Sequence, residues 1–306
     1  GGYGFPESHS ASFALLAYVS AWLKCHHPAA FYVGLLNSQP MGFYSPSQLV
    51  QDAQRHHILI LPIDVNHSDW DHQLLSSGDT RQAPIRLGLR LVKGLSQAAG
   101  KRISDVRRQR AFTNLADLRR RASLDRKNME ALAAADALSS ISGHRHQTHW
   151  QTMALEDHRP LLPAEASPHH ETGPEVRLPA PSLGEDVLAD YQHTGLSLKA
   201  HPLALLRTQY PFSQCTPQKE LIRLGNHRFV RIAGLITCRQ RPGTASGVVF
   251  LTLEDETGNM NVIVWPAVQE RYRQALMTSQ LVVIKGTVEA RDGVVHVIAS
   301  ALENHS

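Results

Sequence analysis

The sequence has only three cysteines in 306 residues, and Cys25, Cys215 and Cys238 are widely spaced. Few, scattered cysteines are typical of a reducing compartment, so we expect no disulfide framework and a cytoplasmic location. Long apolar runs are also lacking, because the longest, Ala11 to Leu23, is too short for a membrane span and contains serines. No segment has the pattern of a secretion signal. The composition therefore predicts a soluble protein without a membrane partner.

Sequence motifs of common enzymes are lacking too. There is no Gly-x-Ser-x-Gly elbow, Walker sequence or Ser-His-Asp pattern. Two groups have a possible metal-ligand spacing: Asp64, Asp69 and Asp71, and His144, His146 and His149. No glycine-bearing calcium loop surrounds the aspartates, and no cysteine or carboxylate stands near the histidines. We therefore expect no metal site and no bound cofactor in this chain.

Positive charge is concentrated in one block. Residues 86–127 contain thirteen Lys or Arg and three Asp, a net charge of +10, whereas the whole chain is +4 and the remainder is therefore −6. A basic block with apolar helical periodicity fits a surface that contacts phosphates. A solvated, arginine-rich helix face fits the charge equally well, and charge alone leaves both interpretations open.

Within this block, residues 91–96 and 98–103 have the form of a helix-hairpin-helix motif. Backbone N–H groups at the start of its second helix can bind a phosphate. Serine stands where a second hairpin glycine is usual, and residues 112–139 could form a paired second unit. The motif predicts sequence-independent contact with the backbone of duplex DNA. Its candidate DNA-binding residues are Lys93, Gly94, Ser96, Lys101 and Arg102.

The first part of the chain is predicted to be helical. Apolar residues from Phe13 to Leu23 recur at helical spacing, and Ser8 or Ser10 could cap this helix. Pro28 ends the helix or begins the next one. Residues 58–65 are rich in β-formers but contain a proline, which favours an edge strand or an extended connector.

The last hundred residues change to the period of β-strands. Five runs are predicted as strands: Phe229–Arg239, Val248–Glu254, Asn261–Trp265, Leu281–Ala290 and Val294–Ala299. Asp292-Gly293 is a hairpin signal, and an amphipathic helix is expected at 267–277, between the third and fourth strands. This is the order of an OB-fold barrel. The predicted fold class is therefore multidomain α+β, with a helical segment and tandem helix-hairpin-helix followed by a five-stranded OB-fold β-barrel.

Six prolines between Asp157 and Asp186 indicate a linker. The predicted divisions are 1–80 for the first helices and a connector, 81–155 for the helix-hairpin-helix domain, 156–186 for the linker, 187–220 for a helical connector and 221–306 for the OB domain.

OB folds bind single strands through a basic groove and aromatic platforms. The candidate residues are Arg231, Arg239, Arg241, Lys285 and Arg291 for phosphates and Phe250 for stacking. Phe250 alternates with the more apolar Val249 and Leu251, so it is expected to face outward. Trp265, which precedes Pro266, is expected in the core.

The opening stretch GYGFPESHSASFALLAYVSAWLKCHHPAAF closely resembles the fingers segment of bacterial C-family DNA polymerases, the alpha subunits of DNA polymerase III. The Phe-Pro-Glu-Ser-His variant resembles the error-prone branch, because replicative members tend to have Asn-Lys in place of Pro6-Glu7. Residues 63–70, 191–195 and 200–202 match the family as well. The resemblance covers nearly the whole chain and keeps the family order of fingers, tandem helix-hairpin-helix and OB barrel.

The resemblance implies a C-terminal fragment of an error-prone DNA polymerase, an enzyme of damage-tolerant, template-directed synthesis. Family members also carry a PHP domain and a palm, whose three aspartates hold two Mg²⁺ ions. Neither domain lies in this sequence, so we expect the chain to bind DNA but not to polymerise it. In the family the Ser-His-Ser loop lies near the sugar of the incoming nucleotide, which makes Ser8, His9 and Ser10 candidate contacts to its sugar or phosphate. The partners implied are duplex DNA, single-stranded template and, through another protein, the sliding clamp.

Two alternatives stay open. One is a fragment of the replicative alpha subunit, which carries a clamp-binding peptide, although Gln151–Leu155 matches such a peptide poorly. The other is a non-catalytic OB-fold module that binds single-stranded DNA or RNA.

Overall fold

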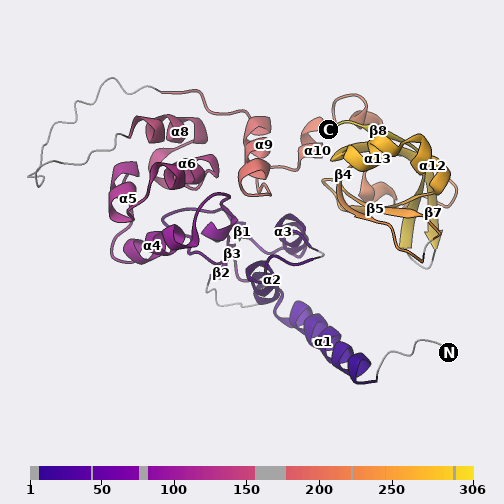
Figure 1. Ribbon diagram of the computed structural model, residues 1–306, viewed down its shortest axis with the longest axis horizontal. Helices are drawn as coiled ribbons and strands as arrows, with labels where there is room; N and C mark the ends of the chain where they lie inside the picture. Colours follow the sequence, from indigo (N-terminus) through magenta and orange to yellow (C-terminus); the bar gives the residue numbers. More distant parts are fainter. Residues whose placement is uncertain are drawn as a thin grey trace, which may run out of the picture. The chain divides into compact units, whose positions relative to one another are not determined.

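A computed structural model of the chain describes residues 7–42, 44–75, 82–155, 177–221, 223–244, 246–291 and 294–306. The chain divides into two units, Gly1–Lys199 and Ala200–Ser306. Each unit packs around apolar side chains of its own, and Figure 1 shows that helices dominate the first unit and strands the second. The predicted fold class is confirmed.

Three helices open the first unit: α1 (Glu7–His26), α2 (Pro28–Asn37) and α3 (Pro46–Arg55). Pro28 and Pro46 each occupy the first helical position, where the fixed φ of proline suits the helix and its missing N–H is no loss. Because α1 already begins at Glu7, Ser8 and Ser10 lie inside its first turn, and the prediction that one of them caps the helix is wrong.

Helix α1 is apolar on all sides, and residues 9–23 are all exposed. Its large exposed side chains are Phe13, Leu15, Leu16, Tyr18, Val19, Trp22 and Leu23. A helix of this kind is normally buried in a larger protein. In the described parts of the chain no helix is both long and apolar enough to cross a membrane.

A small sheet follows these helices. Its strands are β1 (Ile60–Leu61), β2 (Gln73–Leu74) and β3 (Ile85–Arg86), in the order β1-β3-β2. β1 pairs with β3 in parallel and is an edge strand that ends before Pro62, as the sequence indicated. Trp70, on the connector, lies directly against Gly100, where any larger residue would overlap the indole ring. This contact fixes the following helical region to the sheet.

The other helices of the first unit are η1 (Leu89–Leu91), α4 (Gln97–Arg107), α5 (Leu115–Arg121), α6 (Arg126–Ala134), α7 (Ser139–Ser142), α8 (Arg145–Ala154) and α9 (Leu183–His193). Buried side chains such as Ile103, Leu118 and Leu132 share one core with the N-terminal helices. Helix α9 begins before residue 187, the predicted start of the helical connector, and packs against α6. The first unit therefore includes α9 and ends at Lys199, inside that connector.

Short helical segments open the second unit: α10 (Pro202–Leu206), η2 (Phe212–Gln214) and α11 (Gln218–Leu221). His201 joins them to the barrel. Its Nδ1 accepts a hydrogen bond from the Leu203 N–H at 3.2 Å, and its Nε2 lies 3.3 Å from a carboxylate oxygen of Glu254. The side chains of His201 and Glu254 are 9% and 3% exposed, and the imidazole links the start of α10 to a barrel strand.

The barrel is closed by β4 (Phe229–Gln240), β5 (Val249–Glu254), β6 (Asn259–Val264), β7 (Leu281–Arg291) and β8 (Val294–Asn304), in the order β4-β5-β6-β8-β7. β6 and β8 pair in parallel, and the other pairs are antiparallel. All five predicted strands are present. The helix expected between the third and fourth strands is interrupted at Tyr272, which gives α12 (Pro266–Arg271) and α13 (Arg273–Thr278).

One buried histidine couples the N-terminal helices to the small sheet. The backbone of His72 exchanges two hydrogen bonds with the side chain of Asn37, at 3.0 and 2.8 Å. Its ring is buried and accepts a hydrogen bond from the Gly88 N–H at Nδ1, at 3.1 Å. Burial, and then the charge of Arg90, lower the pKa of His72 from 6.5 to about 4. The fold therefore requires the neutral imidazole.

Acid should destabilise the first unit through this residue. Because the folded-state pKa of His72 is lowered, its contribution is complete above the unfolded-state pKa of 6.5 and is lost as the pH falls towards about 4. Over that interval we expect a loss of up to about 3 kcal/mol in the free energy of unfolding. Urea unfolding of the wild type and of His72→Gln measures it: the variant should show a flatter pH dependence. Equal slopes in both proteins would contradict the assignment.

Candidate nucleic-acid interface

The first candidate surface is the hairpin between η1 and α4. Gly94 has a φ of +87°, a conformation that favours glycine. Ser96 caps α4 by accepting the Ala99 N–H at 3.2 Å, so that one amide of the helix start is already bonded. Gly94, Ser96 and Lys101 are exposed. The hairpin and the first turn of α4 are therefore accessible to a phosphate, and that contact stays a prediction.

Two of the three basic residues predicted beside the hairpin already bind carbonyl groups. The backbone N–H of Lys93 donates a hydrogen bond to the His193 carbonyl at 2.9 Å. Its Nζ donates to the carbonyls of Tyr191 and Gln192, which are also in α9, at 3.2 and 2.8 Å. Arg102 donates to the carbonyls of Ala122 and Ser123 at 2.9 and 3.2 Å. Lys101 is exposed and forms no hydrogen bond or ion pair with the described residues, so its ammonium is available to a ligand.

Several other basic residues of this block form hydrogen bonds and ion pairs within the fold. Arg107 binds the carbonyls of Val65 and Ser68. Buried Asp117 receives hydrogen bonds from Arg110 and Arg121, both at 3.1 Å. Burial of Asp117 opposes its ionisation, but the hydrogen bond from Arg121 and those of its other donors hold the pKa of the carboxyl below its usual range. The block is therefore neither purely a solvated face nor purely a phosphate surface.

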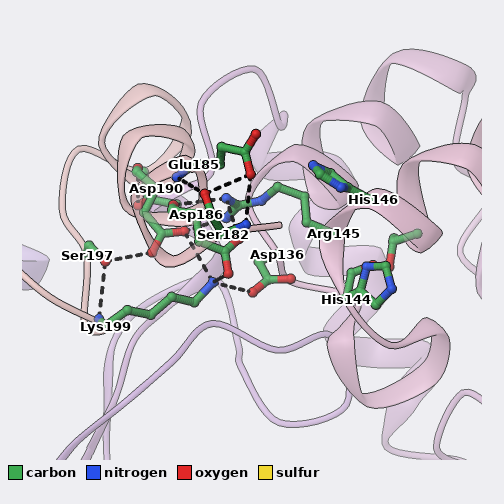
Figure 2. A network of polar contacts seen from close by, with 12 residues as sticks. Asp136, His144, Arg145, His146, Ser182, Glu185, Asp186, Asp190, Ser197 and Lys199 are labelled. Carbon is green, nitrogen blue, oxygen red and sulfur yellow. Dashed lines mark hydrogen bonds and ion pairs between the residues drawn. The ribbon is translucent and has the colours of Figure 1, made fainter. Parts of the chain in front are cut away.

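A second network attaches α9 to this region, as Figure 2 shows. Arg145, which begins α8, is buried and pairs with Asp186 at 3.1 Å and with Asp190. Lys199 lies 2.9 Å from both Asp136 and Asp186. The helix-hairpin-helix region and helix α9, which follows residues 156–176, are thus joined by ion pairs.

The histidines with metal-like spacing take part in the same attachment. His144 caps α8 through Nδ1, and its Nε2 lies 3.1 Å from the Leu178 carbonyl. His146 lies at the same distance from the Pro179 carbonyl, and His149 is exposed. The ring nitrogens of His144 and His146 therefore hold the chain that returns to α9, and among the described residues those of His149 do not take part.

The three aspartates with metal-like spacing, Asp64, Asp69 and Asp71, each bind different partners within the fold. Asp64 is buried and accepts hydrogen bonds from the Asn66 N–H and the Ser140 hydroxyl, at 2.7 and 3.0 Å. Asp69 pairs with Arg107 and Asp71 with Arg90. Among the described residues, no three His, Cys, Asp or Glu side chains are grouped so that they could hold a metal ion.

The Ser-His-Ser residues lie at the start of α1. His9 and Ser10 are exposed, and the His9 ring packs edge-on against Phe13 at 4.4 Å between centroids. The side chain of Ser8 lies outside the described residues. A contact of these three residues with a nucleotide stays a prediction.

The second candidate surface is the outer face of β5 and β6. Val249, Leu251 and Leu253 are buried, whereas the intervening Phe250 and Thr252 are only partly buried. The alternation predicted for this strand is therefore confirmed, with Phe250 on the outside. Phe250 pairs across the sheet with Gln240 and Ile263, so an aromatic and an aliphatic side chain lie side by side on this face.

Trp265, the residue after β6, is a further exposed aromatic side chain that the prediction missed. It is 51% exposed, so its expected place in the core is wrong. Pro266 starts α12, and Trp265 becomes the residue before that helix instead of a strand residue. The alternation argument used for Phe250 would have found it, since Met260, Val262 and Val264 are the buried set of β6. Asn261 and Ile263 lie on the same outer side of β6, and neither was among the candidate residues predicted for the barrel.

The cations proposed for the barrel do not form one groove. Arg231 and Lys285 lie opposite each other on β4 and β7, and both pair with Glu303, at 3.3 and 2.6 Å. The guanidinium of Arg231 also lies 5.7 Å from the ring of Tyr210, which is exposed. These two residues therefore belong to a different pair of strands from Phe250.

The other three cations lie near the ends of strands. Arg239 binds the carbonyls of Leu276 and Ser279, at the end of α13. Arg241 is exposed in the loop after β4. Arg291 ends β7, and its side chain lies outside the described residues. Six barrel residues were predicted to contact nucleic acid. Among those whose side chains the structure describes, only Phe250 and Arg241 form no ion pair and no hydrogen bond to a carbonyl.

The weak clamp-peptide match lies in a helix. Gln151 to Ala154 belong to α8, where Thr152 is buried, and the Leu155 carbonyl accepts a hydrogen bond from Arg119 at 3.0 Å. The segment is therefore part of the folded first unit and does not present an extended peptide.

Comparisons with known proteins identify the same two modules. Residues 57–148 match a family model described as a helix-hairpin-helix motif, and residues 230–304 match one described as an OB-fold nucleic acid binding domain. The error-prone DNA polymerase of Teredinibacter turnerae is 53% identical over 315 residues, covering 100% of this chain and 30% of that protein. That of Saccharophagus degradans is 52% identical over 309 residues, with the same coverage.

Together, a helix-hairpin-helix motif and an OB fold define a nucleic-acid-binding protein segment. The chain belongs to the error-prone branch of the bacterial C-family DNA polymerases and corresponds to their C-terminal portion, which confirms the resemblance found in the sequence. It spans about 30% of the length of these relatives.

Removing the Phe250 ring should weaken single-strand binding without unfolding the barrel. If the ring stacks on a base, Phe250→Ala should cost about 1–3 kcal/mol of affinity for single-stranded DNA. Phe229→Ala is the matched control, because Phe229 is an exposed phenylalanine of the same barrel that pairs with Thr287 on β7. Titration and thermal unfolding of both variants measure the effect. Lower stability with normal affinity in Phe250→Ala would show that the ring acts in packing instead.

Proposed function

We propose that the chain holds primer–template DNA within an error-prone polymerase that carries out damage-tolerant synthesis. The helix-hairpin-helix region would grip the duplex backbone, and the barrel would bind the single-stranded template. The observation that carries this proposal is the presence of both modules in one chain that is 53% identical along its whole length to an error-prone DNA polymerase.

The first hairpin supports the duplex role. Gly94 and Ser96 are exposed next to Lys101, whose ammonium is not engaged with the described residues. Backbone amides and a lysine at the start of a helix contact phosphates without reading bases. Such binding suits a polymerase, which must accept every sequence.

The β5–β6 face supports the single-strand role. Phe250 and Trp265 offer aromatic surface, and Arg241 lies exposed on the loop that joins β4 to β5. Stacking on aromatic side chains tolerates any base, and a nearby cation attracts the backbone. The same chemistry would also bind RNA, so the non-catalytic alternative predicts equal affinity for RNA and DNA strands.

Nucleotidyl transfer would belong to another part of the whole polymerase. Two-metal catalysis requires carboxylates grouped around both Mg²⁺ ions, and the described residues contain no such group. The apolar surface of α1 supports burial against further polymerase domains. The Mg²⁺-binding palm, a cytoplasmic location and access to the sliding clamp through another protein complete the proposal.

The chain alone should not extend a primer at any magnesium concentration. Extension assays with highly purified protein, with a full-length error-prone polymerase as the positive control, measure this. Metal-dependent extension that disappears in Asp69→Asn or Asp71→Asn would contradict the proposal.

Duplex binding should depend on Lys101. Lys101→Ala should weaken binding about equally for all sequences and reduce the slope of log affinity against log salt by about 1. Lys127→Ala is a useful control, because it removes an exposed lysine of the same basic block that lies on a different helix, α6. Fluorescence anisotropy at several salt concentrations gives both slopes. If Lys101→Ala leaves the slope unchanged, the first hairpin does not contact phosphate.

A further inference from the structure

The C-terminal end of α9 binds the first hairpin. Three successive carbonyls, of Tyr191, Gln192 and His193, converge on Lys93. The last of them accepts the Lys93 backbone N–H at 2.9 Å. The other two lie 3.2 and 2.8 Å from its ammonium. A single hairpin residue therefore provides both an amide and a cation to the end of this helix.

These donors are the kind that a helix-hairpin-helix motif offers to DNA. The last carbonyls of a helix carry a partial negative charge equivalent to about half an electron. A phosphate oxygen is the corresponding external acceptor, and it binds backbone N–H groups and lysine in such motifs. The end of α9 thus presents to Lys93 the same chemistry as a phosphate.

Both acceptors cannot use Lys93 fully at the same time. Its backbone N–H is directed at the His193 carbonyl, and two acceptors already lie within 3.2 Å of its ammonium. A phosphate placed beside them would meet the negative end of the helix dipole, which is unfavourable. Phosphate binding at Lys93 and docking of α9 therefore oppose each other.

We propose that the end of α9 is an internal ligand of the first hairpin and competes with a DNA phosphate for Lys93. Docked α9 leaves Lys101 and the exposed hairpin amides to hold the duplex weakly. Undocked α9 adds Lys93 to the DNA contact. The inference rests on the proposed function, because it requires that the hairpin binds duplex DNA.

The ion pairs behind α9 set its docking. Arg145 holds Asp186 and Asp190, which lie on α9, and Lys199 joins Asp186 to Asp136 of the helix-hairpin-helix region. Arg145 is 7% exposed, so it is not itself accessible to a phosphate. Removing Arg145 should release α9 while leaving the hairpin sequence unchanged.

This arrangement gives a test with an unusual sign. Arg145→Ala removes a positive charge, and on charge alone it would weaken DNA binding. Competition predicts the opposite: several-fold tighter binding of a short duplex by the full chain, and a salt slope about 1 larger because one more phosphate contact forms. The double variant Arg145→Ala/Lys93→Ala should lose both gains.

Further variants keep the test decisive. Lys199→Ala also removes a cation from the network, lies away from the hairpin and replaces Arg145→Ala if that variant does not fold by circular dichroism. In the wild type, adding duplex should increase hydrogen exchange at the amides of α9. Duplex binding by Lys101→Ala, measured together with the other variants, shows whether the first hairpin contacts DNA at all.

The outcomes separate the two ideas. If the wild type binds duplex and Lys101→Ala weakens it, but neither Arg145→Ala nor Lys199→Ala binds more tightly, the competition is wrong and the proposed function stands. If the wild type does not bind duplex with a salt dependence and Lys101→Ala changes nothing, the proposed function and this inference both fail.

Discussion

The buried pairing of Arg145 with Asp186 and Asp190 is the interaction on which the first unit's organisation depends. It joins α8 to α9 across the 156–176 segment and so returns the chain to the helix-hairpin-helix region. Breaking a buried ion pair by removing one partner typically costs about 3–5 kcal/mol, because a charge is left unpaired. The position of α9 and its contact with the first hairpin follow from this pairing.

Other basic residues of the first unit are also bound within the fold and so are not free to bind DNA. Lys93 and Arg102 bind the carbonyl ends of helices, and Arg107 binds the connector between β1 and β2. Arginine suits such sites because its planar fork satisfies several acceptors at once. A net charge of +10 in this block therefore overstates the charge that a phosphate would meet.

Features set by local sequence could be predicted. Pro28 begins a helix where its φ requires it, and the five strands follow from period-two patterns, with Phe250 correctly placed outside. Features set by distant contacts could not. Nothing near Lys93 indicates that α9, about a hundred residues later, would bind it. Trp265 is different: local alternation with the buried Met260, Val262 and Val264 already pointed outward, and the prediction of a core position did not use it.

The central claim is that one DNA substrate engages the first hairpin and the β5–β6 face together. Hydrogen exchange of the full chain, with and without a primer–template that carries a single-stranded overhang, tests this most directly. The account predicts slower exchange at the amides of residues 94–98 and in β5 and β6 with the primer–template. Blunt duplex should slow exchange at the hairpin alone, and a single strand should do so at the barrel alone. The account is contradicted if the primer–template slows exchange at neither surface. It is also contradicted if blunt duplex slows exchange at the barrel.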